Sequence, residues 1–156
     1  ANLKVIDDIN SQESENITVL FKPHHYDLEA IKELNLSFSN IEFCFSWDTN
    51  EIMLISDLFI GDYSGVVFDY FYLNKYEIGF CPDVTNYLKN HRDIYWKLDE
   101  IYVNLALSKV ELKELIHSFV TFGHLDQNVH KSRFINRTNP SQSNSCVAWE
   151  RIKQTL

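Results

Sequence analysis

The sequence predicts an α/β fold with a parallel sheet and helices on both faces. Short apolar segments rich in β-branched and aromatic residues alternate with segments of helical character. Strands and helices that alternate in this way form a parallel sheet covered by its crossover helices. The length of 156 residues and the hydrophobic content of 45% suit one folded domain. We therefore expect residues 1–156 to form a single Rossmann-like domain.

Four segments are predicted to be strands of one sheet with at least four strands. The first segment is β-branched and is followed by Pro23, which a central strand does not accommodate. The predicted strands are 17–22, 41–45, 57–61 and 76–80.

Helices are predicted before, between and after these strands. Asp48 or Thr49 is a candidate N-cap, and apolar residues such as Leu112 and Ile116 recur with helical spacing. The segment 86–100 mixes aromatic and charged residues and is predicted to be a loop. The predicted helices lie near 3–10, 27–35, 48–56, 64–74, 108–120 and 145–155.

Charge and cysteine usage exclude several classes of protein. The formal net charge of −8 argues against a nucleic-acid-binding protein. Cys44, Cys81 and Cys146 are widely spaced, which indicates reduced thiols in the cytoplasm rather than a disulfide framework or a zinc site. No apolar stretch has the length of about 18 residues that a bilayer span needs. The chain begins without Met, in what reads as mid-helix, so we expect a fragment of a longer protein.

Two polar segments follow predicted strands, where ligands bind in an open parallel sheet. KPHH (22–25) follows the first strand, and GDYSG (61–65) follows the third and opens a helix. Backbone N–H groups at a helix start attract anions. Ser64 adds a hydroxyl donor, and Gly65 allows a phosphate close to the backbone. The alternative is that Ser64 is an ordinary N-cap.

Three further side chains are candidates, each with a plainer alternative. Asp69 lies one helical turn after Gly65 and either accepts hydrogen bonds from ligand hydroxyls or is buried with a paired partner. His24 either contacts phosphate or acts as an acid or base, or it is a solvated loop residue. Arg92, beside His91, makes a second phosphate contact or lies on the surface. The other histidines lack ligand spacing, so no metal site is predicted.

Three segments, in this order and spacing, resemble the CDP-glycerol glycerophosphotransferases, bacterial enzymes that build teichoic acids and related capsule polymers. They are similar to the family's Lys-Pro-His-Pro strand exit, its Asp-Tyr-Ser-Ser…Phe-Asp block, and its Asp-x-x-x-Tyr turn and Arg-x-x-Tyr loop. The segments are ITVLFKPHH, ISDLFIGDYSGVVFDYFYLNK and CPDVTNYLKNHRDIYWKLDE.

The resemblance implies a two-domain glycosyltransferase architecture of the GT-B kind, with this chain as the C-terminal half that binds the activated donor. His24 would be the catalytic group and would hold the donor pyrophosphate together with Ser64. Asp62 and Tyr63 would shape the turn, and Asp69 would lie near the ribose or the polyol. No cofactor is implied. The donor-binding residues that the resemblance implies are Asp62, Tyr63, Ser64, Gly65, Asp69 and Arg92.

Four positions depart from the family's motifs. His25 and Tyr76 stand where the family has Pro, Gly61 stands where it has Thr, and Gly65 replaces its second Ser. Gly65 thereby removes one hydroxyl that could bind phosphate. These departures bear on which donor binds more than on the fold.

The function expected from the resemblance is transfer of a polyol phosphate from a CDP-activated polyol, such as CDP-glycerol, to a teichoic acid or capsule polymer. A polymer or lipid-linked acceptor would bind through the missing domain, so these residues alone are expected to be inactive. The alternatives are a non-catalytic nucleotide-binding module and a sugar-nucleotide glycosyltransferase half-domain. We expect a cytoplasmic protein. Peripheral attachment to the inner face of the cell membrane is an alternative.

Overall fold

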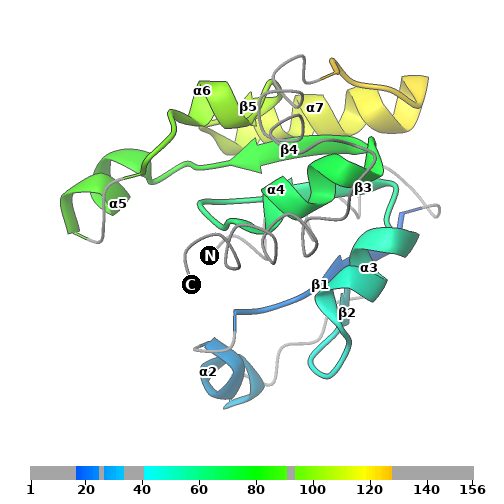
Figure 1. Ribbon diagram of the computed structural model, residues 1–156, viewed down its shortest axis with the longest axis vertical. Helices are drawn as coiled ribbons and strands as arrows, with labels where there is room; N and C mark the ends of the chain where they lie inside the picture. The colour runs from blue at the N-terminus through cyan, green and yellow to red at the C-terminus, as the bar shows by residue number, and fades with distance from the viewer. Residues whose placement is uncertain (1–16, 25–26, 34–40, 91–93, 128–156) are drawn as a thin grey trace, which may run out of the picture.

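A computed structural model describes residues 17–24, 27–33, 41–90 and 94–127 and confirms a mixed α/β architecture with parallel strands (Figure 1). Every strand pairing in these ranges is parallel. The strands are β1 (Val19–Phe21), β2 (Ile41–Phe43), β3 (Leu58–Gly61), β4 (Tyr76–Phe80) and β5 (Leu105–Ala106). The helices are α2 (Leu28–Glu33), α3 (Thr49–Ile55), α4 (Val66–Tyr70), α5 (Val84–Asn90), α6 (Leu98–Ile101), α7 (Lys109–Phe122) and the 3-10 helix η2 (Phe71–Leu73).

The described strands form two sheets, whereas a single sheet of at least four strands was expected. β1 pairs with β2, and the second sheet has the order β3-β4-β5. The central strand β4 is buried beyond its first residue, while all four residues of β3 are half-buried, as befits an edge strand. The expectation of one sheet is therefore wrong for the described part of the chain. Hydrophobic periodicity identifies strands, but it does not specify which strands pair.

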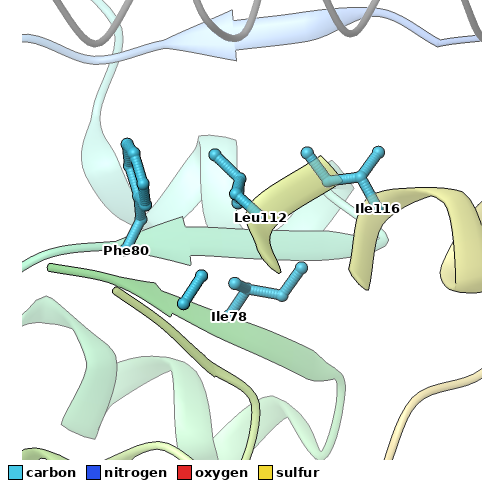
Figure 2. Packing of buried hydrophobic residues seen from close by; sticks show 5 residues of the cluster. Ile78, Phe80, Leu112 and Ile116 are labelled. Atoms are coloured by element: carbon cyan, nitrogen blue, oxygen red, sulfur yellow. The ribbon is translucent and has the colours of Figure 1, made fainter. Parts of the chain in front are cut away.

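Helices cover both faces of the three-stranded sheet, as predicted. Side chains alternate along a strand, so Ile78 and Phe80 of β4 point to one face. There they pack with Leu112 and Ile116 of α7 (Figure 2). A second buried cluster lies under α4 and α6 and consists of Val67, Phe71, Ile101 and Tyr102.

Side-chain caps fix the start of two predicted helices. Asp48 is the N-cap of α3 and accepts a hydrogen bond from the backbone N–H of Asn50 at 2.8 Å. Ser108 caps α7 by accepting from the N–H of Glu111, whose carboxylate accepts in return from the Ser108 hydroxyl. The bond from the Glu111 N–H satisfies one of the backbone donors that a helix start leaves open. α7 ends at Gly123, whose φ of 72° favours glycine.

Two local predictions differ from the structure, one strand was not predicted, and two predicted helices lie outside the described residues. The helix expected over 64–74 divides into α4 and η2 and ends at Asn74, which has a φ of 51°. The loop expected over 86–100 carries most of α5 and all of α6. The two-residue strand β5 is too short to show periodicity. The helices expected near 3–10 and 145–155 lie outside the described residues.

Two lysine side chains join the strands to neighbouring segments. Lys22, just after β1, donates to the carbonyls of Cys44, Phe45 and Trp47, at 3.2, 3.1 and 2.6 Å. Lys75, just before β4, donates to three carbonyls at the C-terminal end of α3, with Leu54 O at 2.6 Å. An ammonium has three donors, and a cation at a helix C-terminus is favourable. Each lysine thus fixes a chain reversal next to a strand.

Replacing Lys75 with Met is expected to lower the free energy of unfolding by about 1–2 kcal/mol, because the carbonyls at the end of α3 lose a charged donor. Urea denaturation measures the change. Lys89→Met, on the exposed surface of α5, is the matched control and should be nearly neutral. Equal stabilities of the two variants would contradict this role of Lys75.

No helix within the described ranges is long and apolar enough to cross a bilayer. The longest of them, α7, has 14 residues, and its buried residues Leu112 and Ile116 pack against the sheet.

Candidate functional site

The turn at 62–65 lies at the carboxyl edge of the three-stranded sheet (Figure 1). Because β3, β4 and β5 are parallel, the segments that follow them, beginning at Asp62, Cys81 and Leu107, leave the sheet from the same edge. Ligands of open parallel sheets bind at this edge. The position predicted for the turn, after a parallel strand and before a helix, is confirmed.

Side chains within the turn organise its own backbone. The carboxylate of Asp62 accepts a hydrogen bond from the N–H of Ser64 at 3.0 Å. The Ser64 hydroxyl oxygen accepts a longer one, 3.4 Å, from the N–H of Val66. The N-cap position itself is occupied by Gly65, so no side chain caps α4. Since Ser64 accepts in this bond, its hydroxyl hydrogen is still available to donate to an anion.

The start of α4 contributes less to anion binding than the sequence suggested. α4 has five residues before it tightens into η2, so few aligned peptide dipoles add up there. The backbone at Gly65 is open, because a Cβ built on this residue would meet nothing within 4 Å. Its φ is −67°, so the backbone conformation does not demand glycine. Open space in front of the backbone is therefore what Gly65 offers a ligand.

Residues outside the turn hold it on two sides. The Tyr63 hydroxyl donates to Asp83 Oδ1 at 2.8 Å, and its ring stacks on that of Tyr87, with centroids 3.8 Å apart. The Tyr102 hydroxyl donates to the carbonyl of Asp62 at 2.8 Å. Burial, together with the hydrogen bond to Asp83, raises the pKa of Tyr63 well above its ordinary range. Both hydroxyl groups are therefore protonated donors near neutral pH, since burial raises the pKa of Tyr102 as well.

The other predicted site residues are not all assembled around this turn. Asp69 is exposed on α4, so the alternative of a buried, paired carboxylate is wrong. His24 is exposed after β1, in the other sheet, and its sharing a site with Ser64 stays a prediction. Arg92, with its neighbour His91, lies outside the described residues.

Cys81 follows β4 at the same edge and is fully buried. Burial, with a smaller effect from nearby Asp62 and Asp83, raises the pKa of the Cys81 thiol to about 12. A thiol with this pKa is protonated at neutral pH and is a poor nucleophile. Cys81 is therefore a core residue.

A hollow beside α7 is chemically unsuited to an anionic ligand. It is lined by Glu111, Glu114 and Asp126, among others. Hydrogen bonds from the Leu107 N–H and the Ser108 hydroxyl lower the pKa of Glu111, which keeps it ionised. Three carboxylates would repel a phosphate. Asp62 and Asp83 also lie at the turn, but only the turn adds the Ser64 hydroxyl and the open backbone of Gly65, so it is the better candidate.

Sequence reasoning did not identify Tyr102, Asp83 or Tyr87 as parts of this site. Asp83 and Tyr87 belong to the Asp-x-x-x-Tyr pattern in the resemblance, so the sequence carried a signal for them but not their contact with Tyr63. Tyr102 lies 40 positions after Asp62 in the chain, and no spacing rule predicts that contact.

The matches with known proteins all point to the same family. The sequence pattern of the family described as CDP-glycerol:poly(glycerophosphate) glycerophosphotransferase matches residues 5–155. The chain is 32% identical, over 117 residues, to a teichoic acid poly(ribitol-phosphate) polymerase of Bacillus spizizenii. It is 39% identical over 72 residues to a teichoic acid ribitol-phosphate primase, and 31% identical over 104 residues to a teichoic acid poly(glycerol phosphate) polymerase, both of the same organism.

These matches cover 71%, 46% and 66% of this chain but only 18%, 18% and 25% of the respective relatives. The chain thus corresponds to a minor part of the curated relatives it matches. No solved structure matches the chain. Because the family pattern extends over nearly the whole sequence, the chain belongs to the CDP-glycerol:poly(glycerophosphate) glycerophosphotransferase family of transferases.

Proposed function

We propose that this chain binds a CDP-activated polyol and serves as the donor-binding half of a GT-B-type polymerase that extends a teichoic acid or a related polymer. The observation that carries the proposal is the position of the family block at 62–69. It begins at the carboxyl edge of a parallel sheet, with the Ser64 hydroxyl and the open backbone of Gly65 side by side. CDP-glycerol comes from the family's description, and the relatives' names include both ribitol and glycerol polymers. These names support glycerol or ribitol as the proposed polyol.

In the proposed reaction an acceptor hydroxyl attacks the β-phosphorus of the CDP-polyol. The bond from that phosphorus to the bridging oxygen breaks, CMP leaves with the electron pair, and the acceptor's proton passes to a base outside the described residues. Ser64 and His24 would donate hydrogen bonds to the pyrophosphate and stabilise the charge that develops on the departing oxygens. Asp62 and Tyr63 shape the turn that presents Ser64, and Arg92 is proposed as a further phosphate contact.

Calorimetric titration with CDP, CMP, CDP-glycerol, CDP-ribitol and UDP-glucose tests this function. We expect CDP and the CDP-polyols to bind, and CMP, which lacks the β-phosphate, to bind more weakly. UDP-glucose binding as tightly as CDP-glycerol would favour a sugar-nucleotide transferase instead. Tight CDP-glycerol binding without transfer by the full-length protein would indicate a non-catalytic module.

Asp69→Asn is expected to leave the affinity for CDP unchanged and to weaken CDP-glycerol about 3- to 10-fold, because the exposed carboxylate would accept a hydrogen bond from a polyol hydroxyl. Parallel titrations with the two ligands measure the difference. Asp57→Asn, an exposed acid at the opposite end of β3, is the matched control. An equal loss for CDP and CDP-glycerol would remove Asp69 from polyol recognition.

A further inference from the structure

Two glycines face each other across the sheet next to the turn. Gly61 of β3 and Gly79 of β4 are register partners. A Cβ on Gly79 would lie 2.4 Å from the Tyr102 ring, and a Cβ on Gly61 would lie 2.9 Å from the Tyr102 hydroxyl oxygen. Both distances are far below van der Waals contact. The Tyr102 ring therefore lies directly on Gly79, and Gly61 is covered jointly by the Phe59 ring, 2.3 Å from such a Cβ, and by the Tyr102 hydroxyl.

The packing of Tyr102 on these glycines fixes the position of its hydroxyl group. Tyr102 is 1% exposed and packs in the cluster with Val67 and Phe71, so its ring has little freedom to move. Its hydroxyl reaches the carbonyl of Asp62, the first residue of the turn. The Asp62 carboxylate in turn accepts from the Ser64 N–H. A short chain of bonds therefore connects the buried ring to Ser64.

The other side of the turn is held from α5. Asp83, just before this helix, accepts from the Tyr63 hydroxyl, and Tyr87, within it, stacks on the Tyr63 ring. α5 has no buried residue, so packing in the core does not explain its position. Figure 1 shows α5 beyond the carboxyl end of β4, away from α7. The contact with Tyr63 links α5 and the turn directly.

We propose that Tyr102, Asp83 and Tyr87 are positioning residues that hold the turn at 62–65, and with it the Ser64 hydroxyl, in the shape that binds the donor. None of the three needs to touch the ligand. A site fixed before binding avoids the entropic cost of ordering it. This inference rests on the proposed function for the ligand, but the restraint on the turn can be tested without one.

The test uses Tyr102→Phe, which removes the hydroxyl and keeps the ring, with Tyr95→Phe as the matched control because Tyr95 is 90% exposed. The backbone amide shifts of Ser64 and Val66 are measured by NMR, and CDP affinity by calorimetry. We expect Tyr102→Phe to move both amide signals and to weaken CDP about 2- to 10-fold. Tyr95→Phe should do neither.

Asp83→Ala is the second variant and is expected to produce the same two changes from the other side of the turn. Asp83 is exposed, so its substitution leaves the core intact. This variant therefore tests the turn even if Tyr102→Phe disturbs the core. Unmoved amide signals together with parental CDP affinity in both variants would overturn the proposal. A second outcome would also overturn it: Tyr102→Phe weakens CDP binding without moving the amide signals, and Asp83→Ala leaves CDP binding unchanged. General destabilisation by Tyr102→Phe would then explain the lost affinity. Shifted amides in a protein whose parent form does not bind CDP would refute the proposed function and leave the positioning role standing.

Discussion

Gly79→Ala is expected to destabilise the protein by about 1–3 kcal/mol, the usual cost of overpacking a core. The added Cβ would lie 2.4 Å from both Cγ and Cδ2 of Tyr102. These atoms are at the base of the ring, and the ring is 1% exposed with its hydroxyl bonded to Asp62. Tyr102 therefore cannot move aside without breaking that bond or displacing its neighbours. Thermal unfolding followed by circular dichroism measures the change.

Gly65→Ala is the matched control for this substitution. Its Cβ would enter open space, and its φ of −67° suits alanine. We expect its stability to be unchanged or raised by a few tenths of a kcal/mol, because alanine reduces the conformational entropy of the unfolded chain. If Gly79→Ala proved as stable as Gly65→Ala, the close packing of Tyr102 on β4 would be wrong.

Ser64→Ala is expected to weaken CDP binding about 10- to 100-fold, since hydrogen bonds to charged groups contribute about 1.5–3 kcal/mol. The backbone of the turn should persist, because Asp62 still accepts from the N–H at position 64. His24→Ala should have an effect of similar size. Calorimetric titration measures both variants.

Ser118→Ala, on α7, is the control and should bind CDP like the parent. Parental affinity in both Ser64→Ala and His24→Ala would mean that the turn merely starts a helix. A loss confined to Ser64→Ala would exclude His24, which follows a strand of the other sheet, from the site.

Much of the local structure could be predicted because it depends on nearby residues. Asp48 and the apolar spacing around Leu112 predicted α3 and α7, and the alternating segments predicted parallel strands. What failed depends on contacts between distant segments. Neither the separate β1–β2 sheet nor the carbonyl contacts of Lys22 follow from periodicity, because both are settled by tertiary packing.

The candidate site was predictable to a similar extent. The position of Ser64 after a strand could be inferred, because ligand sites in parallel sheets follow from topology. The close packing on Gly61 and Gly79 could not be predicted. The role of a glycine in a strand is ambiguous until the side chain that covers it is known. The anchors of the turn, Tyr102 and Asp83, come from segments 20 or more positions away.

The most direct test of the account is to map CDP binding on the backbone amide signals of the protein by NMR. We predict that the largest shifts on adding CDP occur at Ser64, Gly65 and Val66, because the diphosphate would contact this turn. Shifts that centre instead on the hollow beside α7, around Glu111 and Ser118, would contradict the account, as would an unchanged spectrum of the turn at saturating CDP.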